Sequence, residues 1–140
     1  MAEPEGTPAP ARPPLLIALA VLLFLEAAGA VALVVWLGFE LASASPESVA
    51  GGVALVLLAV LAAAWILLTA VSTLRGRSWV RASAVTWQVL QIAVAIGSFQ
   101  GLYARPDLGW ALLVPAVVGI VLALAPSVVR ATTRNKPEQD

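Results

Sequence analysis

Glu26 is an acidic residue in the middle of an apolar stretch. Residues 15–37 contain no other charged side chain, and a helix of this length measures about 35 Å, which is enough to cross a bilayer with some tilt. The carboxyl would then lie near the midplane, where an ionised acid costs about 2.5–3.5 kcal/mol and must face other helices. Two interpretations stay open: a site for a proton or cation, or a protonated acid that only hydrogen-bonds one helix to another.

Two amides are the expected partners of this acid. Gln88 and Gln91 lie on one face of a later apolar stretch, residues 79–100, and Ser98 extends that face. If both stretches cross in the same direction their midpoints share one depth, so Gln88 or Gln91 should bond to Glu26. Because burial disfavours the charged form and no basic side chain lies at that depth, we expect Glu26 to be protonated at neutral pH. The amides could instead line a polar cavity, although helix packing is their commoner role.

Arg75, Arg77 and Arg81 form a basic cluster between the second and third apolar stretches. Phosphate groups of anionic lipids would attract them, which makes them candidate lipid contacts. The alternative is that they only set the orientation of the chain in the membrane. Of the eight Lys and Arg residues, all but Arg105 lie in the two tails or near this turn, so both termini should be cytoplasmic.

The composition excludes much catalytic and metal chemistry. The chain has no Cys and no His, which removes thiolate nucleophiles, imidazole bases and Cys/His metal sites. It also has no phosphate-binding Gly loop and no nucleophile–base set, so we predict no enzyme, no catalytic residue, no metal site and no cofactor. The formal net charge is zero, which gives no reason to expect a nucleic acid as partner.

Lipid is the expected solvent of the fold. Hydrophobic residues make up 61% of the chain and charged residues 11%, against about 25% charged in soluble domains. The pattern predicts an all-α bundle of four transmembrane helices, at about residues 15–37, 49–74, 79–100 and 108–129. The Pro-rich residues 1–14 and the polar residues 130–140 should be disordered tails.

The fourth stretch carries small residues at four-residue spacing. This pattern predicts a ridge that another helix can approach closely, formed by Ala111, Pro115, Gly119 and Ala123. Pro115 lacks a backbone N–H, so it should also kink the helix.

The first stretch has one alternative interpretation, a cleaved signal peptide. Ala42-Ser43-Ala44 has the small-residue spacing of a cleavage site. A signal peptide, however, has an apolar core of about 7–15 residues after a basic segment. This stretch is longer, and Glu3 and Glu5 precede it together with Arg12, which favours a membrane span.

Residues 26–39 resemble the first helix of small multidrug resistance transporters. The resemblance rests on Glu26-Ala27-Ala28-Gly29 and Gly38-Phe39. It implies that the glutamate exchanges protons for cationic substrates across an antiparallel dimer. That family's motifs in helices two and three are missing here, and its dual topology disagrees with the strong Lys and Arg bias of this chain.

Most of the chain, about residues 15–135, is similar to uncharacterised small four-helix integral membrane proteins of actinobacteria. The similarity rests on the arginine-rich turn at residues 75–81, on Gln88 and Gln91, and on Ala125-Pro126-Ser127. It implies a bacterial inner membrane and no particular activity.

The function favoured by these patterns is that of a multi-pass accessory or interaction protein. Its partners would be the lipid bilayer and another membrane protein or a second copy of itself. The alternative is a small proton-coupled transporter, or a subunit of one, that uses Glu26. A Glu26 carboxyl open to water would favour transport, whereas a dry bundle would favour the accessory role.

Overall fold

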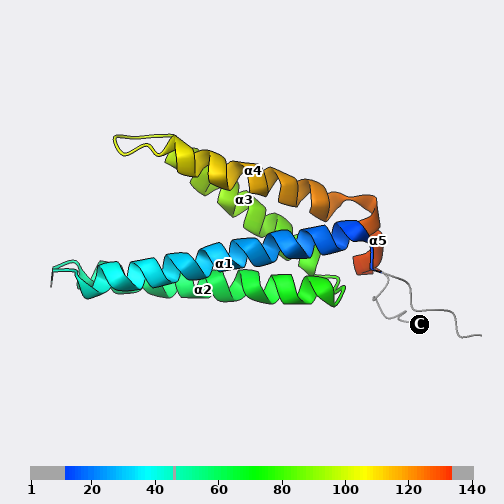
Figure 1. Ribbon diagram of the computed structural model, residues 1–140, viewed down its shortest axis with the longest axis horizontal. Helices are drawn as coiled ribbons and strands as arrows, with labels where there is room; N and C mark the ends of the chain where they lie inside the picture. The colour runs from blue at the N-terminus through cyan, green and yellow to red at the C-terminus, as the bar shows by residue number, and fades with distance from the viewer. Residues whose placement is uncertain (1–11, 46, 134–140) are drawn as a thin grey trace, which may run out of the picture.

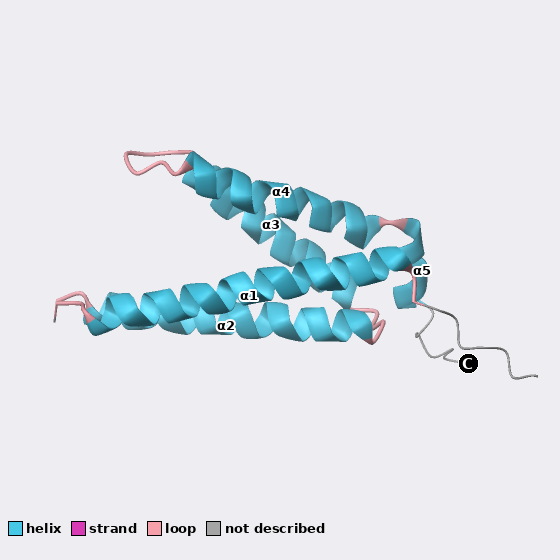
Figure 2. Ribbon diagram, in the orientation of Figure 1, coloured by secondary structure: helices cyan, strands magenta, loops and turns pink. Residues whose placement is uncertain are grey.

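The computed structural model describes residues 12–45 and 47–133, and these residues form helices with no strand (Figures 1 and 2). The helices are α1 (Pro14–Ala42), α2 (Val49–Leu74), α3 (Val80–Ser98), α4 (Pro106–Leu124) and α5 (Pro126–Thr133). The first four are long and apolar enough to cross a membrane. The predicted all-α fold with four candidate spans is therefore confirmed, with α5 as an additional short helix.

Proline begins three of the helices: Pro14, Pro106 and Pro126 are the first residues of α1, α4 and α5. The first position suits proline because its missing N–H would have no partner inside the helix and its backbone φ is already helical. Pro126 thus starts a new helix, so the fourth span ends at Leu124 and not at residue 129. The prediction of a disordered tail is wrong for residues 130–133, which are helical, whereas residues 1–11 and 134–140 lie outside the described part of the chain.

The turn between α2 and α3 is built on a glycine in the left-handed conformation. Gly76 has φ 65°, its N–H donates to the carbonyl of Thr73 at 3.0 Å, and the N–H of Arg77 donates to the carbonyl of Ser72 at 3.3 Å. This pair of bonds closes the end of a helix and reverses the chain sharply. Arg75 and Arg77 are exposed at this turn.

The spans pair into two antiparallel hairpins, α1–α2 and α3–α4, which approach each other at the end that carries α5 and diverge at the other end (Figure 1). The first hairpin is longer, with helices of 29 and 26 residues against 19 in each helix of the second. Along the described chain, α1 and α2 have no buried residue between Ala27 and Ala63. The core shared by the two hairpins is therefore confined to the end where they meet.

The second hairpin packs tightly along its length through small residues. In α4 the buried positions are Gly109, Ala116, Gly119 and Ala123. The predicted ridge is thus correct at Gly119 and Ala123 but wrong at Ala111, which is exposed; Pro115 is half-buried. Gly109, Ala116 and Ala123 are seven residues apart, and Gly119 lies between the last two. The buried residues therefore repeat about every two helical turns, as expected for two helices that pack nearly antiparallel, and not every four residues.

Candidate functional site: a polar cluster between the hairpins

Glu26 of α1 and Gln88 of α3 meet where the two hairpins converge. The Gln88 amide Nε2 donates to Glu26 Oε2 at 3.0 Å, and Gln88 is completely buried. Glu26 itself is partly buried. Of the two amides expected as partners of the acid, Gln88 makes the hydrogen bond, whereas Gln91 also lies near the carboxyl but donates elsewhere.

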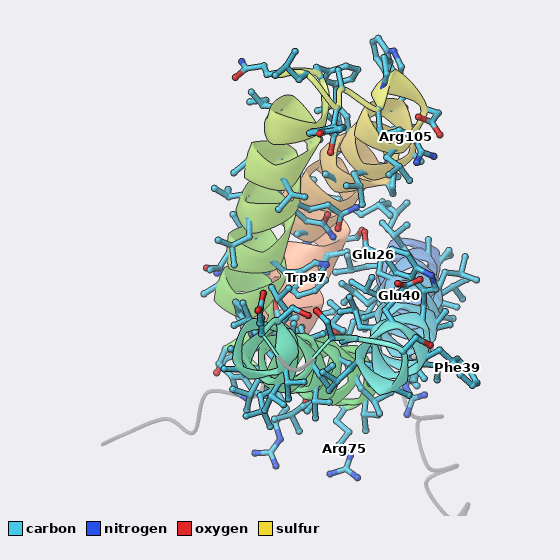
Figure 3. The ribbon with its side chains drawn as sticks, turned by 90° about the vertical axis from the view of Figure 1, so that its left-hand side faces the viewer. Glu26, Phe39, Glu40, Arg75, Trp87 and Arg105 are labelled. Carbon is cyan, nitrogen blue, oxygen red and sulfur yellow. The ribbon has the colours of Figure 1, made fainter. Side chains whose placement is uncertain are left out.

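Three polar atoms at this contact are buried without a hydrogen-bond partner: Glu26 Oε1, Gln88 Oε1 and Trp87 Nε1. The Trp87 indole N–H lies beside the Glu26 carboxyl without completing a bond to it (Figure 3). A buried polar atom that lacks a partner costs about 1–3 kcal/mol, and three such atoms side by side are unusual. The cluster therefore has unused capacity to bind a proton or a small polar group.

Gly119 of α4 makes the room that the Gln88 amide occupies. A Cβ placed on Gly119 would lie 2.5 Å from both Cδ and Nε2 of Gln88. Real carbon atoms in contact are about 3.5–4.0 Å apart, so an alanine here would displace the amide. Gly119 is thus a positioning residue for the Glu26–Gln88 bond.

Gln91, the other predicted amide, bonds to the backbone of α4. Its Nε2 donates to the carbonyl oxygen of Leu112 at 2.9 Å. Pro115 has no N–H to donate to the carbonyl of Ala111 four residues before it, so Gln91 bonds the carbonyl next to the one that loses its helical donor. Ser98 does not join the cluster, because its hydroxyl donates to the carbonyl of Val94 in its own helix at 2.9 Å.

A second polar contact joins the hairpins through α2 and α3. Trp65 Nε1 donates to Ser83 Oγ at 2.8 Å, and the hydroxyls of Thr69 and Ser83 are also 2.8 Å apart. The ring of Trp65 stands perpendicular to that of Trp87, with centroids 5.8 Å apart. Sequence reasoning missed these residues, although hydroxyl side chains deep in an apolar stretch are a signal for interhelical contacts.

The charges are divided between the two ends of the bundle. Among the described residues, the end where the hairpins converge carries five arginines and no acid: Arg12, Arg75, Arg77, Arg81 and Arg130. Arg75 projects away from the helices there (Figure 3).

The opposite end carries the exposed acids Glu40 and Glu47 and one ion pair, in which Arg105 and Asp107 lie 2.8 Å apart. Arg105 donates to both carboxylate oxygens of Asp107, from Nε at 3.1 Å and from Nη2 at 2.8 Å. Among the described residues, one end thus carries five arginines and the other carries one, and a bias of Lys and Arg is what orients membrane proteins.

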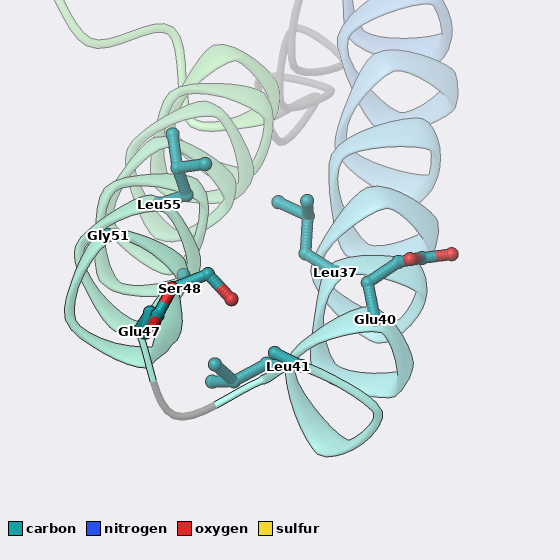
Figure 4. Close-up of a pocket in the computed structure, with 9 residues that line it drawn as sticks. Leu37, Glu40, Leu41, Glu47, Ser48, Gly51 and Leu55 are labelled. Carbon is teal, nitrogen blue, oxygen red and sulfur yellow. The ribbon is translucent and has the colours of Figure 1, made fainter.

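The half of α1–α2 away from α3–α4 contains a cavity of about 450 Å³ between its two helices (Figure 4). Its walls are mostly apolar and include Leu37, Leu41 and Leu55. The Glu40 carboxylate points away from the space between the helices (Figure 4). Because its walls are mostly apolar, the cavity suits an apolar side chain or an acyl chain better than a polar ligand.

No protein-family model, curated protein or solved structure matches the chain.

Proposed function

We propose that this multi-pass membrane protein is an accessory protein that binds another membrane protein through the uncovered half of the α1–α2 hairpin. The observation that carries the proposal is the absence of any buried residue in these two helices between Ala27 and Ala63, among the residues described. A hairpin of this length with half of its surface unpacked by its own chain is available to a helix from another protein.

Three glycines on this half support protein contact over lipid contact alone. A Cβ at Gly29, Gly38 or Gly51 would have nothing within 4 Å. Glycine weakens a helix by about 1 kcal/mol relative to alanine and is enriched where transmembrane helices approach each other closely. Since these glycines serve no contact within the described chain, they are suited to a contact with a partner, and the apolar cavity beside Gly51 can receive one of its side chains.

Photo-crosslinking in intact membranes tests this role. A photoreactive residue replaces Leu57 on the uncovered half or Val94 on α3, two side chains with nearly equal exposure, 60% and 59%. We expect one discrete protein adduct from Leu57 and only lipid adducts from Val94. Lipid adducts alone from both positions, or the same protein adducts from both, would contradict an accessory role for this surface.

The proposed location is the inner membrane of a bacterium, with both chain ends in the cytoplasm. The arginines gathered at one end of the bundle support this orientation, because basic residues are retained on the cytoplasmic side. In this orientation Arg75, Arg77 and Arg81 face the headgroups of the cytoplasmic leaflet and contact anionic lipid.

Proton-coupled transport is the second candidate function. The observation that favours it is the set of unpartnered polar atoms around Glu26 at the junction of the hairpins. Exchange of Glu26 for Gln keeps a hydrogen bond to Gln88 but removes the exchangeable proton. A Glu26→Gln protein that stays folded and loses pH-driven cation uptake into vesicles supports transport, whereas equal uptake by both proteins rejects it.

A further inference from the structure

The donors and acceptors around Glu26 can form hydrogen bonds with its carboxyl in both the protonated and the ionised state. The described contacts supply one bond, from Gln88 Nε2 to Glu26 Oε2. Two acceptor atoms remain, Glu26 Oε1 and Gln88 Oε1, together with one donor, the indole N–H of Trp87. Each state of the carboxyl gives Glu26 Oε1 a different partner: Gln88 Oε1 when the acid is protonated, and the Trp87 N–H when it is ionised.

A protonated Glu26 pairs completely with Gln88. Gln88 Nε2 donates to Glu26 Oε2, and the added Oε1–H is a donor for Gln88 Oε1, an acceptor that has no other partner; the two bonds together would close a ring between an acid and an amide. Gly119 holds the amide in place for this ring, because the Gln88 side chain occupies the space of its missing Cβ. In this state the Trp87 N–H has no hydrogen-bond acceptor at the site.

An ionised Glu26 pairs with both neighbours. Each oxygen of the carboxylate can then accept one bond: Oε2 accepts from Gln88 Nε2, and Oε1, which has no partner, is available to the Trp87 N–H beside the carboxyl. The proton released from Oε1 passes to water, Gln88 Oε1 loses its donor, and the Trp87 N–H gains an acceptor. Hydrogen bonds to a charged acceptor are about twice as strong as neutral ones, which offsets part of the cost of the charge.

No other charged side chain lies close enough to Glu26 to take part in this change of bonding. α2 has no charged residue at all among its described positions. The charged groups on the other packed helices are remote: Arg81 on α3 lies about 10 Å along the axis from Gln88, and Asp107 on α4 about 18 Å from Gly119. Glu40 on α1 lies about 21 Å from Glu26 along its helix, and Arg130 is on α5, beyond the end of α4.

The geometry points to a proton-binding site in which Glu26 carries the proton, Gln88 binds both states and Trp87 binds only the ionised state. The inference deepens the second candidate function and shares its site, although a proton can be held here without any transport. Trp87 packs perpendicular to Trp65 of the other hairpin. The proton-binding site therefore lies directly beside a contact between the hairpins.

Spectroscopy of the full chain in lipid vesicles tests the site. Infrared spectra over a pH series report the carbonyl band of a protonated acid, and the indole ¹⁵N–¹H resonances of labelled protein report the tryptophans, with Trp87 assigned by Trp87→Phe. We expect an acid band that Glu26→Gln abolishes and that Gln88→Leu shifts to higher frequency, because the carbonyl loses its donor. As this band disappears with rising pH, the Trp87 resonance should shift.

Trp65 provides the internal control, because its indole N–H already has a partner in Ser83 at 2.8 Å and should keep its resonance. In Glu26→Gln the Trp87 resonance should be independent of pH. An acid band that persists at every pH, or that disappears while the Trp87 resonance stays constant, overturns the two-state site. Loss of cation uptake is a separate measurement, so a working proton site without uptake would reject transport and leave this inference standing.

Discussion

Replacement of Gly119 by alanine should break the hydrogen bond between the hairpins, although neither Glu26 nor Gln88 is itself substituted. The new Cβ would lie 2.5 Å from Gln88 Cδ and Nε2, so the amide must withdraw by about 1 Å to reach ordinary contact. The 3.0 Å bond to Glu26 would then lengthen beyond about 3.5 Å and cease to be a hydrogen bond.

The expected loss of stability combines three contributions. Overpacking costs about 1–3 kcal/mol, and a lost polar contact within a membrane costs about 0.6–2 kcal/mol. The better helix propensity of alanine returns up to about 1 kcal/mol. We therefore expect Gly119→Ala to lower the free energy of unfolding by about 0.6–5 kcal/mol, measured by reversible unfolding with SDS in mixed micelles.

Two other glycines provide matched controls. A Cβ on Gly97 would meet nothing within 4 Å, so Gly97→Ala should be neutral or slightly stabilising. A Cβ on Gly109 would lie 2.6 Å from the ring of Phe99, so Gly109→Ala should be destabilising but independent of Gln88. If shortening Gln88 to alanine does not reduce the cost of Gly119→Ala, or if Gly119→Ala is as stable as Gly97→Ala, the reasoning is refuted.

Changes at two further sites have defined outcomes. Glu26→Gln should leave the free energy of unfolding nearly unchanged, whereas Glu26→Leu should lower it by about 0.6–2 kcal/mol in the same assay. Equal stability of the two variants would argue against a structural hydrogen bond between Glu26 and Gln88. Neutralising the arginine cluster should give mixed orientation or weaker retention of anionic lipid, and no change in either would require another role for Arg75, Arg77 and Arg81.

The sequence was sufficient to predict four long apolar helices, because they follow from the length and spacing of the apolar stretches. It could not choose between Gln88 and Gln91, since the choice depends on how α3 is rotated against α1 and α4. In the structure, Gln88 occupies the space beside Gly119 and bonds to Glu26, whereas Gln91 donates to the carbonyl of Leu112.

The position of Trp87 beside the acid was not predictable for a related reason. Tryptophan in an apolar stretch is usual at a membrane boundary, and only the packing of the hairpins brings this indole to the carboxyl. The end of the fourth span was also misplaced, because proline can close a helix or begin the next one. At Pro126 it begins α5.

Cysteine labelling in intact cells tests most directly the claim that the four spans cross a membrane with both chain ends inside. The chain has no Cys, so single cysteines at four exposed positions report without background: Ser45, Leu102, Ser78 and Thr133. An impermeant maleimide added outside should label the cysteines at Ser45 and Leu102, and those at Ser78 and Thr133 only after the cells are opened. Equal labelling of all four positions in intact cells would contradict the orientation, and labelling of Ser78 and Thr133 alone would reverse it.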